Sequence, residues 1–326
     1  MMRAMSLMES PDGVLSIRSR RCTMTSSTAS PFSLFAPPYQ ELMAIDTDED
    51  FPDDPKTRGG AALVWILEKG HDERHLERIA GRPGGIPLLV MLPKSGTVSR
   101  VRSRVLKVLE DARPQAVLPF HPRPEVGELR LLLRAEPEDL AGEVLDYLWW
   151  RGLRLRQENR QILRRTVELS AELRTLSALS RGLYISRRAL GRRFRRSGIP
   201  VPSHWLQFCR LLRACIRLQN RHDSLCRVAS SLGYPDGFTL SNQMQRLIGI
   251  RPSAVRKRLG WEWVLEAWLY QEWLEGGLDI WLRGFPERHD PPDLDSPARA
   301  KTKPQPPEAV RERTGSKHPR VRKRAM

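Results

Sequence analysis

Two stretches of the chain, TLSALSRGLYISRRALGRRFRRSGI (Thr175–Ile199) and SLCRVASSLGYPDGFTLSNQMQRLIGI (Ser224–Ile250), follow one pattern. Each begins with a hydroxyl residue and a leucine, a typical start of a helix, and each ends in Gly-Ile. The offset of about fifty residues indicates that one unit of two short helices and a turn occurs twice.

Each unit contains an aliphatic residue beside a small one, which lets a second helix approach closely, and then a turn with a glycine. The pairs are Leu179-Ser180 and Val228-Ala229, and the turn glycines are Gly182 and Gly233. Residues 202–220, between the units, have apolar residues at helical spacing and arginines opposite them. A long amphipathic helix is therefore predicted to join the two units, with Arg210, Arg213 and Arg217 on its polar face.

The second unit carries a specific resemblance. Several of its residues keep the order and spacing found in one protein family. They are Val228-Ala229, Gly233-Tyr234-Pro235-Asp236, Leu240-Ser241, Arg246, Gly249-Ile250, Pro252-Ser253 and Arg256. In these residues the chain resembles the C-terminal double helix-turn-helix DNA-binding domain of the AraC/XylS family of bacterial transcription regulators. The resemblance implies such a domain over residues 175–260. It also implies double-stranded DNA as a partner, with RNA polymerase as a further candidate partner.

In a helix-turn-helix unit the second helix enters the major groove, where each base pair presents a distinct set of donors and acceptors. In the first unit Ser186 is predicted to cap this reader helix, which would leave several arginines facing outward. Glycine at position 191 has no side chain with which to read a base. The resemblance implies base contacts by Arg188, Gly191 and Arg192 and phosphate contacts by Ser186, Arg187 and Arg195.

The reader helix of the second unit is predicted over residues 237–247, and it departs from the family's usual residues at two places. Asn242 stands where the family usually has arginine, and Phe238 stands where a small polar residue is usual. We therefore expect the first reader to contribute most of the affinity. The resemblance implies base contacts by Gly237, Phe238, Ser241 and Asn242 and phosphate contacts by Arg251 and Lys257.

The charge of the chain is concentrated in this region. Residues 151–260 hold 24 Lys and Arg but 5 Asp and Glu, whereas residues 61–150 hold 13 of each kind. A strongly basic domain is typical of a protein that binds a polyanion. Two functions fit this charge: a sequence-specific transcription regulator, and a non-specific nucleic-acid-binding or nucleoid-associated scaffold.

The region before it has a different pattern. Residues 1–60 lack periodicity and are predicted to be disordered. Residues 61–152 alternate strands (61–67, 87–92 and 115–120) with helices (71–81, 96–112 and 137–152) and a short helix or edge segment (125–135). This alternation is typical of a small parallel α/β domain for sensing or interaction. This domain weakly resembles a degenerate receiver with a flavodoxin-like fold. No aspartate stands at the predicted strand ends, so we expect neither phosphoryl transfer nor a magnesium site.

Three further segments complete the predicted multidomain chain. Residues 153–174 are read as one linker helix, which would also serve a homodimer. Residues 261–284 contain five of the nine tryptophans and are read as an amphipathic helical extension. Residues 285–326 are read as a disordered basic tail.

The remaining expectations are negative. No nucleophile–base pair, metal-ligand set or phosphate loop stands out, so we expect no enzymatic activity, no cofactor and no metal. The four cysteines (Cys22, Cys209, Cys215 and Cys226) are expected to be buried free thiols. No apolar run is long enough for a membrane span and no signal peptide is evident, so a cytoplasmic, nucleoid-associated protein is expected. The sequence points to no particular small-molecule effector.

Overall fold

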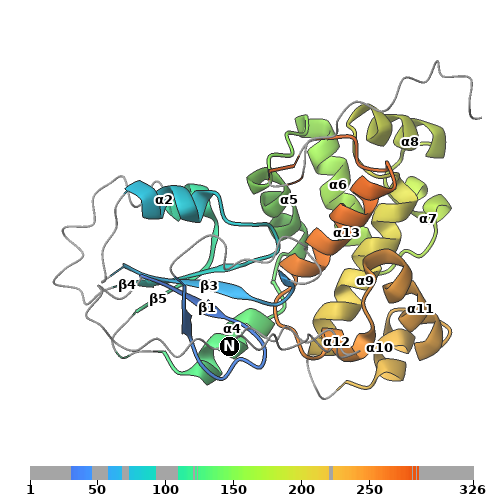
Figure 1. The fold of residues 1–326 in the computed structure, drawn as a ribbon. Coiled ribbons are helices and arrows are strands. Elements are labelled where there is room, and N and C mark those ends of the chain that lie inside the picture. Colours follow the sequence, from blue (N-terminus) through green and yellow to red (C-terminus); the bar gives the residue numbers. More distant parts are fainter. Residues whose placement is uncertain are drawn as a thin grey trace, which may run out of the picture. The chain divides into compact units, whose positions relative to one another are not determined.

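Five strands form one mixed sheet in the N-terminal region of the computed structural model (Figure 1). Their order is β2 (Met43–Ala44), β1 (Phe32–Phe35), β3 (Ala62–Ile66), β4 (Leu88–Leu92) and β5 (Pro114–Pro119). Strands β3, β4 and β5 are parallel, whereas β1 runs antiparallel to both β2 and β3. The structure describes residues 31–45, 58–67, 73–92, 109–119, 122, 124–219, 223–280, 282–283 and 285.

Apolar residues cover both faces of this sheet, because successive side chains of a strand point to opposite sides. One face, with Trp65 and Val90, packs against Ile79 of helix α2 (Glu73–Ala80). The other face, with Val64 and Met91, packs against Leu129 and Leu133 of helix α4 (Val126–Arg134). The central strands are thus buried on both sides, which explains their continuous apolar sequence.

The prediction of disorder for residues 1–60 was wrong for residues 31–45, which contain β1 and β2. Strand β1 has only four residues and lies between prolines, so it shows no measurable period. All four of its residues are buried, and it pairs with β3 in the register Phe32 to Trp65. Its stability therefore comes from a non-local pairing that the local sequence does not reveal.

The predicted parallel, flavodoxin-like arrangement is confirmed only in part, because the three predicted strands are parallel but the sheet has two further strands. A doubly wound sheet changes direction at a switch point in its strand order. Here β3, β4 and β5 follow one another in one direction, and antiparallel β1 occupies the other side of β3. The three predicted strands, as well as α2 and α4, are confirmed. Of the predicted helix over 96–112 only residues 109–112 are described, and they are helical.

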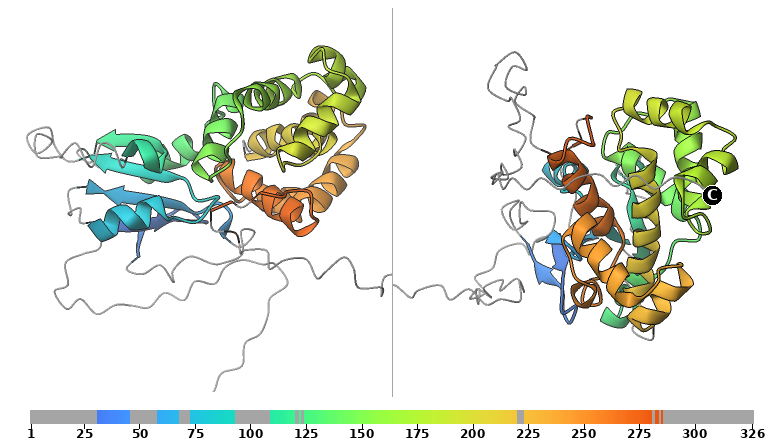
Figure 2. Two further views of the ribbon diagram at one scale, coloured as in Figure 1. Left: turned by 90° about the horizontal axis from the view of Figure 1, so that it is seen from above. Right: turned by 90° about the vertical axis from the view of Figure 1, so that its right-hand side faces the viewer.

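The rest of the described chain is helical and shares one apolar core (Figure 2). Helix α9 (Pro202–Gln219) lies at its centre, because twelve of its eighteen residues are buried and most of the other helices touch it. The neighbouring helices are α5 (Leu140–Trp150), α6 (Gln157–Leu169), α7 (Leu176–Gly182), α8 (Arg187–Arg196), α10 (Leu225–Ser231), α11 (Gly237–Ile248), α12 (Pro252–Val255) and α13 (Glu262–Leu274).

The helix observed in the predicted linker, α6 (Gln157–Leu169), is shorter than the predicted range 153–174. Helix α6 ends at Leu169, where the hydroxyls of Thr166 and Ser170 donate to carbonyl oxygens of the preceding turn. Such bonds compete with the helical backbone pattern. The apolar side of α6, with Ile162, Leu163 and Val167, is buried in the helical core. The residues predicted to support a homodimer therefore pack within the chain.

The extension over 261–284 is not amphipathic. Helix α13 is buried on nearly all sides, including Trp263 and Trp268. The Trp268 ring stacks on Phe208 of α9, with ring centroids 4.1 Å apart, and meets Trp205 edge-on at 4.6 Å. In Figures 1 and 2, α13 runs beside α9. This helix is therefore part of the core that holds the two units.

A buried ionic cluster joins α13 to α5 and to the loop before β4. The Glu266 carboxylate accepts hydrogen bonds from Arg151 and from the Tyr147 hydroxyl, and all three side chains are at most 1% exposed. The Tyr147 hydroxyl in turn accepts from the backbone N–H of Gly85 at 2.8 Å. Gly84 lies so close that a Cβ there would overlap the Glu266 carboxylate. Burial raises the pKa of Tyr147, so its hydroxyl keeps the proton that it donates.

Glu266→Gln should lower the free energy of unfolding of the chain by about 3–5 kcal/mol, because it leaves the buried Arg151 guanidinium without a charge partner. Urea titration followed by circular dichroism measures this loss. Glu275→Gln is the matched control, because Glu275 is exposed and bonds to Gln271 on the surface. It should change stability by less than about 0.5 kcal/mol. Equal effects of the two variants would contradict a structural role for the cluster.

Candidate nucleic-acid interface

The first unit consists of α7 and α8, and both helices begin at the predicted caps. The Thr175 hydroxyl accepts from Ala178 N at 3.1 Å, and the Ser186 hydroxyl accepts from Ala189 N at 3.3 Å. Leu190 and Phe194 turn the inner face of α8 into the core. The opposite face is therefore fixed toward solvent, and the exposed side chains on it are Arg187, Arg188, Arg192 and Arg195.

These four arginines are free for a ligand. In the described part of the chain, none of them forms a hydrogen bond or an ion pair. Arg193, on the same helix, differs because it pairs with Glu158 of α6 at 3.2 Å. A helix that presents several unpaired guanidinium groups on one face can donate bidentate hydrogen bonds to guanine edges or to phosphates.

The second unit consists of α10 and α11. The Ser224 hydroxyl caps α10 by accepting from Arg227 N at 3.1 Å, and the Asp236 carboxylate caps α11 by accepting from Thr239 N at 2.6 Å. The Thr239 N–H holds the pKa of Asp236 below its usual value, so the cap stays charged at neutral pH. Gly249 ends α11 in a left-handed conformation at φ 68°.

The predicted base contacts of the second unit differ in accessibility. Phe238 is 74% exposed and Asn242 is exposed, whereas Ser241 is half-buried. Gly237 is buried, and a Cβ there would lie 3.2 Å from Leu225 Cγ and 3.4 Å from Cys226 Sγ of α10. Its base contact stays a prediction, and close helix packing is a second reason for a small residue at this position.

The other glycine among the predicted base contacts has a different setting. A Cβ at Gly191 would meet nothing within 4 Å, so the α8 surface is open at this point. The predicted phosphate contacts Arg251 and Lys257 are both exposed near α12, and Ser186 is exposed beside its cap bond. The structure thus leaves these positions accessible, with Gly237 as the exception.

The arginines predicted on the polar face of α9 serve the fold instead. Each is partly buried and donates to a neighbouring segment. Arg210 donates to Leu232 O at 2.9 Å, Arg213 to Val167 O at 3.0 Å and Arg217 to Ser231 Oγ at 2.9 Å. Carbonyl oxygens at helix ends lack a helical partner, and Arg210 and Arg213 supply one.

The turns of the two units correspond in a way that the sequence comparison missed. Tyr184 and Gly233 both have positive φ, 55° and 70°, at the same place after the first helix. The next residues make the same bond, Ile185 N to Ser180 O and Tyr234 N to Ala229 O. The match of Gly182 with Gly233 was therefore wrong, because Gly182 is the last residue of α7.

The thiols lie in three settings. Cys209 and Cys215 are buried in α9, as expected, whereas Cys226 of α10 is exposed, so the expectation of burial was wrong for this thiol. Cys22 lies outside the described residues. Burial raises the pKa of Cys209 to about 12, which keeps this thiol unreactive at neutral pH.

Residues 179–258, which are 80 of the chain's 326 residues, match a family model described as a helix-turn-helix domain. The match spans both units and supports a DNA-binding domain like that of the AraC family, and with it a DNA-binding transcription regulator. No curated protein and no solved structure matches the chain. Within the described residues, no helix is both long enough and apolar enough to cross a membrane.

The Ser186 hydroxyl should have a measurable capping role. Ser186→Ala should lower the free energy of unfolding by about 1 kcal/mol, because one N–H of the first turn of α8 loses its acceptor. Ser186→Gly should cost only about a few tenths of a kcal/mol, because glycine is tolerated at this position. Urea titration of both variants tests this, and an equal loss in the two would contradict it. If Ser186 also contacts a phosphate, both variants lose affinity for DNA; if it only caps, Ser186→Gly retains it.

Proposed function

We propose that the chain is a sequence-specific transcription regulator whose helices α8 and α11 enter successive major-groove segments on one side of a DNA duplex. The observation that carries the proposal is the row of unpaired, exposed arginines on α8, on a helix fixed by Leu190 and Phe194. The family match over both units supports DNA as the partner. The proposal assigns the chain no catalytic step.

In this proposal α9 acts as the spacer between the readers. A reader pair held rigidly on one side of the duplex reads two segments about 34 Å apart, one helical turn of DNA. Because Gly237 is buried, base reading by α11 falls to Phe238, Ser241 and Asn242. Phe238 would contact a thymine methyl group and Asn242 would pair with adenine. Arginine–guanine contacts by α8 then dominate affinity.

An in-vitro selection from random duplex DNA tests the proposal. The full chain is the right protein for it, because α5, α6 and α13 complete the core around α9 and a fragment of residues 175–260 would expose that core. We expect an enriched motif with two parts about ten base pairs apart. Tight binding at low salt without any enriched motif would instead indicate a non-specific nucleic-acid-binding scaffold.

Arg192→Ala should reduce affinity for the selected duplex by about 1–3 kcal/mol and relax the base preference at one position. Arg193→Ala is the matched control, because it removes the same charge from the same helix but from a side chain paired with Glu158. It should weaken binding slightly and equally on all sequences. Fluorescence anisotropy with selected and scrambled duplexes measures both. If the two variants behave alike, α8 does not read bases through Arg192.

Binding should weaken steeply as salt rises, because each neutralised phosphate releases counterions. The slope of log K against log salt should become shallower by about 1 in Arg187→Ala, which removes one phosphate contact. Titrations between about 50 and 200 mM salt measure the slope. A flat dependence for the wild-type chain would show that these arginines do not meet phosphates.

A further inference from the structure

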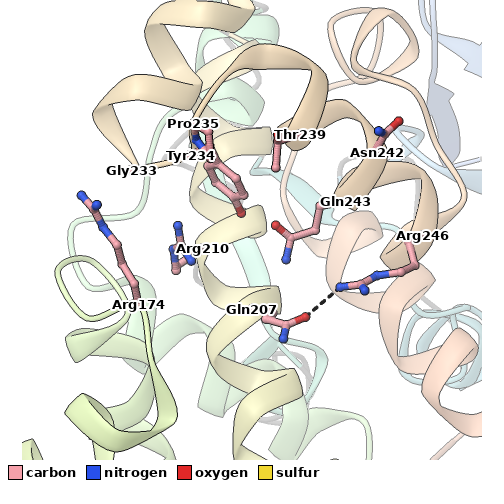
Figure 3. Close-up of a pocket in the computed structure, with 10 residues that line it drawn as sticks. All are labelled: Arg174, Gln207, Arg210, Gly233, Tyr234, Pro235, Thr239, Asn242, Gln243 and Arg246. Atoms are coloured by element: carbon pink, nitrogen blue, oxygen red, sulfur yellow. Dashed lines mark hydrogen bonds between the residues drawn. The ribbon is translucent and has the colours of Figure 1, made fainter. Parts of the chain in front are cut away.

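A groove with a volume of about 490 Å³ lies between α9 and α11, beside the proposed reading face (Figure 3). Its lining comes from the second unit, from α9 and from the residue just before the first unit. Arg174 precedes the Thr175 cap of α7, Gln207 and Arg210 belong to α9, and Asn242 and Arg246 belong to the second reader.

The groove is electrostatically one-sided. Among the described residues that line it, three are arginines and none carries a carboxylate. Arg246 donates to Gln207 Oε1 at 3.0 Å and Arg210 donates to Leu232 O at 2.9 Å, both through a single nitrogen. A guanidinium group carries five N–H donors, so most of these donors remain for a ligand. Three cations without a counter-charge favour an anion with several acceptor oxygens.

Arg174 is placed at the groove by the shape of the backbone. Its guanidinium occupies the space that a Cβ at position 233 would need, which is open because Gly233 has none. Gly233 also has φ 70°, a conformation that suits glycine. Arg174 is exposed, and within the described chain it has no hydrogen bond or ion pair. The guanidinium is thus positioned against the second unit without an internal partner.

Tyr234 supplies a buried polar group that points to a ligand. Tyr234 is only 6% exposed, and its hydroxyl forms no hydrogen bond with any described residue. In Figure 3 this hydroxyl points into the space between Arg210 and Gln243. Burial raises the pKa of Tyr234 to about 12, so the hydroxyl remains a donor at neutral pH. A buried hydroxyl without a partner is costly, and an anion in the groove would remove that cost.

We propose that this groove binds a phosphate-type oxyanion through the guanidinium groups of Arg174 and Arg210 and the hydroxyl of Tyr234. Two sources supply that chemistry: a backbone phosphate of DNA lying between the two readers, and a free phosphorylated small molecule. The first source rests on the proposed function, whereas the second does not. In either case the bound anion joins Arg174, just before the first unit, to α9 and the second unit.

The first experiment uses the full chain without DNA. Inorganic phosphate should raise the melting temperature of the wild-type chain more than sodium chloride at equal ionic strength, because binding stabilises the folded state. Arg174→Gln and Tyr234→Phe should lose about half of this rise or more. Arg165→Gln is the control, because Arg165 lies on α6, pairs with Glu168 on the surface and carries the same charge. It should respond like the wild type.

The second experiment uses the same variants with the selected duplex. If the anion is a backbone phosphate, Arg174→Gln should weaken binding about tenfold, as expected for one charge-assisted hydrogen bond. The loss should be equal on selected and scrambled duplexes, and the salt slope should fall by about 1. Arg165→Gln should leave affinity and slope unchanged. Because Arg174 is exposed, its variant is expected to fold.

The outcomes separate the site from the function. A phosphate response lost in Arg174→Gln without a change in DNA affinity supports the site and assigns it to a free small molecule. A loss of DNA affinity assigns it to the DNA backbone. If Arg174→Gln and Tyr234→Phe match Arg165→Gln in both experiments, the site is overturned while the regulator proposal stands. If the wild-type chain binds no duplex, the regulator proposal fails and the phosphate experiment alone decides the site.

Discussion

The positions of both readers depend on the burial of α9. A helix with twelve of eighteen residues buried has almost no free surface, so each neighbouring helix is held against a fixed set of apolar side chains. Close packing makes such a core resistant to small displacements. The stack of Trp268 on Phe208 adds a flat contact that fixes α13 along α9. The spacing of α8 and α11 is therefore a property of the whole helical core rather than of the two units alone.

The same core reaches the α/β region through α13. Its three buried glutamates each meet a side chain from a distant segment: Glu262 pairs with Arg113, Glu266 pairs with Arg151, and Glu272 shares a hydrogen bond with the His204 ring. Arg113 lies at the start of the last strand, and it also pairs with Glu143 of α5. Leaving any one of these charges unpaired would be costly. The sheet and the readers are thus joined by charge pairing as well as by apolar contact.

Local signals in the sequence predicted the local structure well. The caps Thr175, Ser186 and Ser224 depend on neighbours within one turn, and all three are confirmed. Strand β1 was missed because its partner Trp65 lies about thirty residues away. Helix α13 was misread because glutamates at helical spacing look like a solvent face, and their cationic partners are far away in the chain. The burial of Gly237 could not be predicted for the same reason, since its contact with α10 is tertiary.

The arginines show why composition alone does not locate a binding surface. The excess of positive charge in residues 151–260 is divided between two roles that the sequence does not distinguish. Arg151, Arg213 and Arg217 donate hydrogen bonds to a carboxylate, a carbonyl oxygen and a hydroxyl within the fold. The exposed arginines of α8 have no internal partner among the described residues. A guanidinium that already bonds a helix end contributes little to a polyanion, because its donors and its orientation are fixed. The positive charge available to bind a nucleic acid is therefore smaller than the net charge of the region. It lies on α8 and at the groove beside α11.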